Sequence, residues 1–176
     1  MTFIVAQKQM NLQRSIALVC CALLASCGSG LSAKAAEVRS GNKTFADWCR
    51  EKDSLSPEAK HTVEVLLKTA GTTECDAANQ KLLSLTELSL DNNQISDIKP
   101  LASLTNLTSI ELNGNQISDI KPLASLTNLI LLYLNGNQIS DIKPLASLTN
   151  LILLYLSGNP IAPKTCPLKP EFICKW

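Results

Sequence analysis

The sequence predicts an α/β solenoid, with short strands stacked along one axis, a helical cap at the N-terminal end and a disulfide-bonded cap at the C-terminal end. Three observations lead to this class. The text ISDIKPLASLTNL recurs without change at residues 95–107, 117–129 and 139–151, a period of 22 residues. Leucine and isoleucine fill the same positions of each period. Segments that carry cysteines but lack the repeat flank it on both sides.

The composition is that of an ordinary globular chain and excludes several classes of function. The chain has 176 residues, 45% of them hydrophobic, and its formal net charge is +1 from 16 Lys+Arg and 15 Asp+Glu. The first 26 residues hold two basic residues and no acidic one, so the remainder carries 14 minus 15, or −1. This balance provides no electrostatic attraction for nucleic acid, and we expect no nucleic-acid partner.

Residues 1–26 predict a secretory signal peptide. Lys8 and Arg14 precede an apolar run at residues 16–25, and no acidic residue interrupts them. The run is too short to cross a bilayer as a helix, which takes about 20 residues. Translation from Met10 instead of from the first residue would give a more compact signal.

The end of this signal has two interpretations. The text LASC, which ends at Cys27, directly follows the apolar run and resembles the lipobox of bacterial lipoproteins. It favours a lipidated Cys27, with the lipid as the only membrane anchor. The alternative is cleavage after Ala35, which would release a periplasmic or secreted protein. Either way, the mature chain reaches a compartment that permits disulfides, and residues 27–43 form a linker.

Residues 85–161 contain four copies of the frame L-x-x-L-x-L-x-x-N-x-I, which is the leucine-rich repeat signature. The sequence segment NQISDIKPLASLTNL resembles the 22-residue repeat class of bacterial internalins. With the flanking text TFADWC and AGTTEC, it is also similar to exported leucine-rich repeat proteins of cyanobacteria. The resemblance implies a leucine-rich repeat horseshoe whose strands line its concave face, and it supplies no established ligand.

Stacking explains the frame physically. One repeat cannot bury its own leucines, but adjacent repeats cover one another. The asparagine of each frame is then expected to satisfy backbone groups at the turn, and the proline of each Lys-Pro pair suits the first position of a short helix. The asparagines are Asn93, Asn115, Asn137 and Asn159, and the prolines are Pro100, Pro122 and Pro144.

Atypical caps are expected at both ends, because an open solenoid exposes its apolar ladder. Residues 44–84 predict three short amphipathic helices as the N-terminal cap. Residues 162–176 do not follow the repeat pattern and are expected to form the C-terminal cap. The helix starts are marked by Thr44 with Asp47, by Ser56 ahead of Pro57, and by Thr73 with Asp76, and Gly71 ends the second helix.

The four cysteines that follow the signal allow three disulfide pairings. Strands stack about 4.8 Å apart, so four repeats separate the two caps by roughly 15 Å. A disulfide bridges Cα atoms less than about 7 Å apart. Each cap must therefore pair its own cysteines, which predicts Cys49–Cys75 and Cys166–Cys174.

The sequence offers no catalytic constellation. His61 is the only histidine, and we expect it on the solvent side of the second helix. A histidine-based triad and a zinc site with several histidine ligands are thereby excluded, and no phosphate-binding glycine loop or nucleophile elbow occurs. Each repeated aspartate, such as Asp97, has a lysine two residues later, which indicates a charge-balanced solvated surface. We expect no enzyme, no cofactor and no metal.

The outward-facing strand positions are the candidate site. Strand alternation assigns them to three columns: Glu87, Ser109, Leu131 and Leu153; Ser89, Glu111, Tyr133 and Tyr155; and Asp91, Asn113, Asn135 and Ser157. The last two repeats thus place tyrosine and leucine side by side, whereas the first two carry acids. An exposed patch of this kind is typical of a protein-binding surface.

The leading hypothesis is a protein or peptide partner that buries Tyr133, Tyr155, Leu131 and Leu153, with Glu87 and Glu111 selecting it by charge. One alternative is a structural envelope lipoprotein that self-associates through the patch as a homo-oligomer. Another is an internalin-like adhesin. This alternative is disfavoured because the array has only four repeats. A recent duplication could also have copied the tyrosines, because the third and fourth repeats share the text LTNLILLYL.

Overall fold

The computed structural model of the protein describes residues 43–176. The predicted signal peptide, Cys27 and almost all of the predicted linker lie outside the described residues. Within residues 43–176, no helix has both the length and the apolar character needed to cross a membrane.

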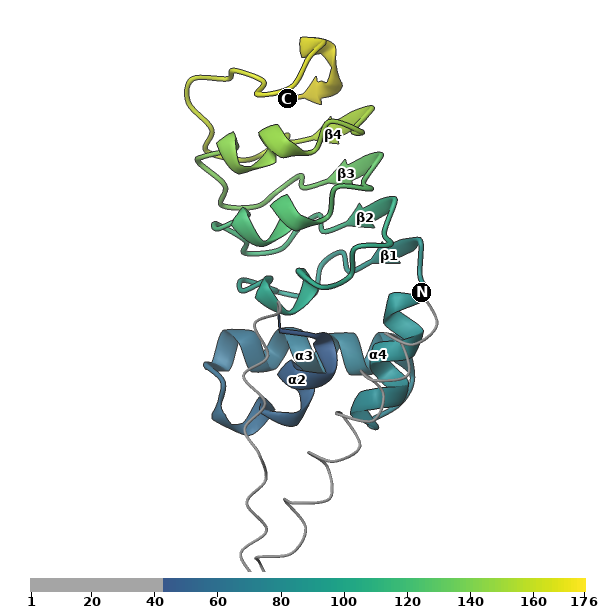
Figure 1. Ribbon diagram of the computed structural model, residues 1–176. Helices are drawn as coiled ribbons and strands as arrows, with labels where there is room; N and C mark the ends of the chain where they lie inside the picture. The colour runs from purple at the N-terminus through teal and green to yellow at the C-terminus, as the bar shows by residue number, and fades with distance from the viewer. Residues whose placement is uncertain (1–42) are drawn as a thin grey trace, which may run out of the picture. The chain divides into compact units, whose positions relative to one another are not determined.

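Three helices at one end are followed by a stack of strands and coils that runs to the C-terminus (Figure 1). The helices are α2 (Phe45–Arg50), α3 (Pro57–Ala70) and α4 (Cys75–Leu83), with a short 3₁₀ turn at Lys52–Ser54. The strands are β1 (Glu87–Ser89), β2 (Ser109–Glu111), β3 (Leu131–Tyr133), β4 (Leu153–Tyr155) and β5 (Cys174–Lys175). They form one parallel sheet in chain order, as a solenoid requires.

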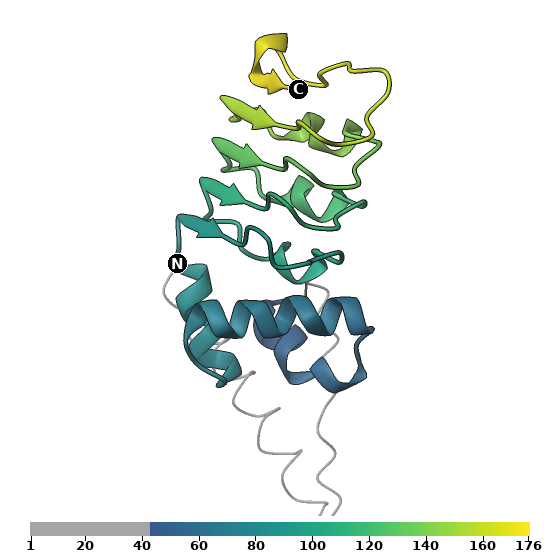
Figure 2. The same ribbon diagram turned by 180° about the vertical axis from the view of Figure 1, so that it is seen from behind.

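Each of the first three repeats has a strand on one side and a 3₁₀ turn on the other, and both sides can be followed in the reverse view (Figure 2). The 3₁₀ turns span Lys99–Leu101, Lys121–Ser125 and Lys143–Ser147. A proline occupies the first or second position of each, where the missing N–H costs no hydrogen bond. The frame leucines and isoleucines between the two sides are buried in one continuous core, except Leu85 at the start of the array, which is half-buried against it. The predicted α/β solenoid with leucine-rich repeats is therefore confirmed.

Two of the three predicted helix starts are confirmed. The Thr44 side chain and Asp47 form a reciprocal capping box at α2, and the Ser56 hydroxyl accepts a hydrogen bond from the Ala59 N–H at 3.3 Å. Helix α3 ends at Gly71, whose φ of 68° lies in the left-handed region that favours glycine.

The predicted start of the third helix is wrong. Helix α4 begins at Cys75 after Glu74, and Thr73 makes no capping bond. The Thr72 hydroxyl instead accepts the Glu74 N–H at 3.2 Å. Asp76, the expected capping partner, forms an ion pair with Arg50 of α2. The Asp76 carboxylate, which the local sequence pattern assigned to the cap of α4, thus takes part in a contact between α4 and α2.

His61 does not face solvent as expected. It is half-buried, and its Nε2 lies 2.7 Å from the backbone oxygen of Asn93 in the first repeat. The neighbouring Thr62 hydroxyl donates to the carbonyl of Asp97 at 2.6 Å. Helix α3 therefore presents this side to the first repeat and covers its open end.

The asparagine ladder holds successive repeats together. The Asn115 side chain is 5% exposed; its Oδ1 accepts the N–H of Asn93 at 3.1 Å and of Ile95 at 2.9 Å. Its Nδ2 donates to the carbonyls of Leu90 at 2.9 Å and Leu112 at 3.0 Å. These bonds satisfy backbone groups that a strand turning into a coil leaves buried and unpaired.

Asn137 and Asn159 also donate to backbone carbonyls, but each accepts one backbone N–H, from Ile117 and Ile139, where Asn115 accepts two. Asn93 differs, because the helical cap precedes it in place of a repeat. Its Nδ2 donates only to the carbonyl of Asp91, at 3.0 Å.

Both predicted disulfides are present. Cys49–Cys75 joins α2 to α4 with Cα atoms 5.6 Å apart, and Cys166–Cys174 closes the C-terminal cap with Cα atoms 5.8 Å apart. Strand β5 is a feature that the sequence analysis missed. It pairs in parallel with β4, and the Leu156 N–H donates to the Lys175 carbonyl at 2.8 Å. Two residues are too few to show alternation, so no pattern marked this strand.

Candidate functional site

The strand face, meaning the outward-facing residues of β1 to β4, aligns side chains from four repeats. The register places Glu87, Ser109, Leu131 and Leu153 in one row, and Ser89, Glu111, Tyr133 and Tyr155 in the next. Residues in register in a parallel sheet project from the same face. The structure thus brings the predicted tyrosines and leucines together. Of the two predicted acids, Glu111 is in register with Tyr133 on the neighbouring strand. Glu87 lies on β1, two strands away from Leu131 on β3.

Tyr133 and Tyr155 form a stack, with ring centroids 4.9 Å apart and ring planes 5° from parallel. They are the only tyrosines in the chain. The ring faces meet each other, and both residues are half-buried. Aromatic edges carry partial positive charge and the rings contribute large apolar area, so this tyrosine stack suits a contact that is partly apolar and partly polar.

Two exposed isoleucines lie directly before β3 and β4, and the sequence analysis missed them. Ile130 is 38% exposed and Ile152 is 60% exposed, although each lies directly before a strand. They line a hollow of about 430 Å³ with Thr108 and the asparagines 106, 128 and 150. Period-two alternation would place them inside, but it holds only within the three strand residues. One sign of these isoleucines was available in the sequence: the position of Thr108 is occupied by isoleucine in the next two repeats.

In the third predicted column, the side chains of Asp91, Asn113 and Asn135 are used in hydrogen bonds, whereas Ser157 takes part only through its backbone N–H. Asp91 Oδ1 accepts the N–H of Asn113 at 2.7 Å, and Asn113 Oδ1 accepts the N–H of Asn135 at 2.9 Å. Asn135 Oδ1 accepts the N–H of Ser157 at 2.9 Å in the same way. These side chains link one repeat to the next, so their role is structural.

Charged residues lie on both sides of the tyrosine stack. Glu111 is in register with Tyr133, and Lys175 of β5 is in register with Tyr155. Within residues 43–176, neither Glu111 nor Lys175 takes part in an ion pair, and the same is true of Glu87. Lys175 was not predicted as a site residue, because its position depends on the unexpected strand β5.

The described residues contain no group of three or more His, Cys, Asp and Glu side chains that could hold a metal ion. The repeated aspartates serve the turns. Asp97 accepts the backbone N–H of Lys99 at 2.9 Å and pairs with its Nζ at 3.2 Å. Asp119 and Asp141 accept the equivalent backbone N–H groups, each at 3.0 Å.

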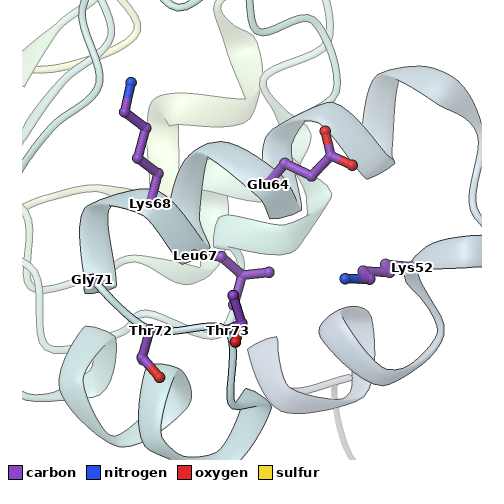
Figure 3. A pocket seen from close by; sticks show the side chains of 7 residues that line it. All are labelled: Lys52, Glu64, Leu67, Lys68, Gly71, Thr72 and Thr73. Atoms are coloured by element: carbon purple, nitrogen blue, oxygen red, sulfur yellow. The ribbon is translucent and has the colours of Figure 1, made fainter.

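The helical cap contains a second hollow, of about 450 Å³, beside α3. Figure 3 shows its lining, in which Lys68 points away from Lys52 and the Thr72 and Thr73 side chains lie on the turn after α3. Its charged groups do not converge on one point, so the arrangement offers neither an acid–base pair nor an anion site.

Comparison with known proteins agrees with the geometry. A family model described as leucine-rich repeats, in two copies, matches residues 83–125 and 127–169. The solved structure of an internalin from Listeria monocytogenes is 33% identical with a TM-score of 0.55, and the match covers 64% of this chain and 34% of the internalin. Residues 83–169 therefore match leucine-rich repeats, and this array is similar to that of an internalin.

Two other solved structures match part of the chain. Internalin C2 of Listeria monocytogenes is 36% identical with a TM-score of 0.46, and the match covers 55% of this chain and 52% of that one. A leucine-rich repeat protein of Leptospira interrogans is 34% identical with a TM-score of 0.45, covering 49% and 23%. The chain thus spans about a third, a half and a quarter of these three structures. No curated protein matches the sequence.

Proposed function

We propose that this chain is a non-catalytic module that binds a protein or peptide on the strand face of its repeats. The observation that carries the proposal is the tyrosine stack beside Leu131 and Leu153, on the exposed side of a sheet whose other side is the core. Leucine-rich repeat proteins generally bind proteins, which supports the same class of partner.

The stack is well prepared for binding. Stacked rings on adjacent hydrogen-bonded strands are already restricted, so a partner that contacts them immobilises few new rotors. Tyrosine is also among the residues that contribute most at interfaces. A partner that covers both rings and the two leucines would gain apolar burial on a preformed surface.

Charge adds selectivity to this surface. Glu87 and Glu111 lie on the first two repeats without ion-pair partners in the described part of the chain. A basic group on the partner would meet them, whereas an acidic group would be repelled. The two acids therefore set which end of a partner lies toward the helical cap.

The module is proposed to act outside the cytoplasm, at the cell envelope. Its two disulfides persist in oxidising compartments, and the predicted signal peptide leads there. A lipid on Cys27 would tether it to a membrane, and cleavage after Ala35 would release it. Mass spectrometry of the mature N-terminus tests this part, since a diacylated Cys27 and a free residue 36 differ by the mass of the lipid and nine residues.

Selection from a displayed peptide library tests the binding itself. The mature protein should enrich peptides that the variant Tyr133→Ala/Tyr155→Ala fails to retain. The matched control is Lys121→Ala/Lys143→Ala, which changes two exposed side chains on the 3₁₀ side and should retain the same peptides. Enrichment that survives loss of both tyrosines would remove this face as the binding site.

A second candidate is self-association, as in a structural envelope protein. The exposed Ile152 and the 68% exposed Phe172 are apolar side chains that a second copy could cover. Analytical ultracentrifugation discriminates the two: concentration-dependent dimers that disappear in an Ile152→Asn variant would favour self-association over a foreign partner.

A further inference from the structure

We infer that the strand face selects an extended peptide segment with a basic residue and an acidic residue four positions apart and an apolar residue midway between them. This inference rests on the proposed function and names the chemistry of its partner. It comes from the order of side chains across four neighbouring strands, which is Glu111, Tyr133, Tyr155 and Lys175. Figure 1 shows β2, β3 and β4 stacked in this order below the C-terminal segment.

The row has opposite charges at its ends and aromatic rings at its centre. Both end charges lack an ion-pair partner among residues 43–176, although the same stretch contains six ion pairs elsewhere. A ligand that runs along the row would therefore place a cation beside Glu111 and an anion beside Lys175. A uniformly basic or uniformly acidic ligand would meet one repulsive end.

The spacing identifies the conformation of the ligand. Three strand separations of about 4.8 Å place the backbones of Glu111 and Lys175 roughly 14 Å apart. An extended chain advances about 3.3 Å per residue, so four residues cover roughly 13 Å. Side chains four positions apart in an extended chain also point to the same side, as does the side chain midway between them.

The midpoint coincides with the tyrosine stack. Halfway between β2 and β5 lies the gap between β3 and β4, where the rings of Tyr133 and Tyr155 meet. The central residue of the segment would contact both rings and the leucine row beside them. An α-helical ligand fits less well, because four of its residues advance only about 6 Å.

Capped synthetic peptides with the core Lys-Ser-Leu-Ser-Glu, in this order and reversed, test the inference by titration into the mature protein. Two further peptides remove or add one serine between the charges. The four-residue spacing should bind about fivefold more tightly than either changed spacing, because those place the charges on opposite sides of the chain. Equal affinity for all three spacings would overturn the inference.

Charge reversal identifies the two ends separately. With Glu111→Lys both ends of the row are basic, so the variant should prefer Glu-Ser-Leu-Ser-Glu by about fivefold over the mixed peptide. With Lys175→Glu both ends are acidic, and the preferred peptide should be Lys-Ser-Leu-Ser-Lys. The control Lys143→Glu, on the 3₁₀ side, should keep the wild-type preference. Unchanged preference in the first two variants would contradict the inference.

The outcomes separate this inference from the proposed function. If Tyr133→Ala/Tyr155→Ala abolishes peptide binding while charge and spacing have no effect, the strand face binds and the selectivity rule is wrong. If the peptides bind regardless of the tyrosines, the site itself is wrong. If no peptide binds, the proposed charge and spacing selectivity is overturned. The proposed function is then tested by the display selection alone. Dimers lost in the double tyrosine variant would place a second copy on the patch and overturn the inference.

Discussion

Replacing Asn115 with alanine removes one complete rung of the asparagine ladder. In the folded protein this side chain accepts the N–H of Ile95 and donates to the carbonyl of Leu90, and both residues are at most 1% exposed. Neither backbone group has another partner among the hydrogen bonds within the described residues. The alanine variant therefore leaves a donor and an acceptor buried without partners.

The expected cost follows from these two groups. A buried polar group that loses its partner costs about 1 to 3 kcal/mol, so the pair costs on the order of 4 kcal/mol. The N–H of Asn93, which also loses its acceptor, is partly buried and reaches water more easily. A loss of about 4 kcal/mol is a large part of the 5 to 15 kcal/mol typical of a whole domain.

Urea unfolding followed by circular dichroism measures this loss. With a slope of about 2 kcal/mol per molar urea, the midpoint should fall by roughly 2 M. The matched control is Asn128→Ala, which removes an exposed bond of 2.9 Å to the Thr105 carbonyl that water can replace. Its midpoint should move by about 0.3 M or less. Equal shifts in the two variants would refute the ladder as a source of stability.

Three further predictions use other contacts. Replacing both Cys49 and Cys75 by serine should lower the free energy of unfolding by about 3 kcal/mol, measured in urea, because the lost loop spans 26 positions. The hydrogen bond from Lys60 holds the pKa of the exposed Asp53 carboxyl below its usual value; its stabilising contribution is complete above the ordinary aspartate pKa and is lost as pH falls through the lowered one. Carbon-13 NMR titration should show this low pKa return toward normal in Lys60→Ala. A double-mutant cycle on the tyrosine stack should give a coupling of about 1 kcal/mol, and zero coupling would mean that the rings do not interact.

The repeat array could be predicted from the sequence because its signals are local and repeated. A fixed period of 22 residues implies stacking, and stacking determines which leucines are buried and which strand residues share a row. The disulfide pairing also followed, since the solenoid length separates the two caps.

The errors arose where one segment contacts another that is distant in the sequence. His61 has a solvent-side position on its own helix, but the first repeat covers it. Asp76 is placed to cap α4, but Arg50 pairs with it. Strand β5 exists because β4 offers an unpaired edge, and two residues cannot reveal that from their own pattern.

The candidate site was predicted only in part for the same reason. Tyr133 and Tyr155 were placed together because the period forces them into register. Lys175 lies beyond the last repeat, and the two exposed isoleucines lie directly before the strands, so strand alternation does not predict their positions.

The most direct test of the strand face as a binding surface uses the two tyrosines as probes. Mature protein labelled with 3-fluorotyrosine should give two fluorine-19 NMR signals, which a Tyr133→Phe variant assigns. A ligand enriched by the display selection should shift both signals as it saturates the protein, because the rings are stacked at 4.9 Å. A ligand whose binding is seen by calorimetry while both fluorine signals stay unchanged would contradict the account.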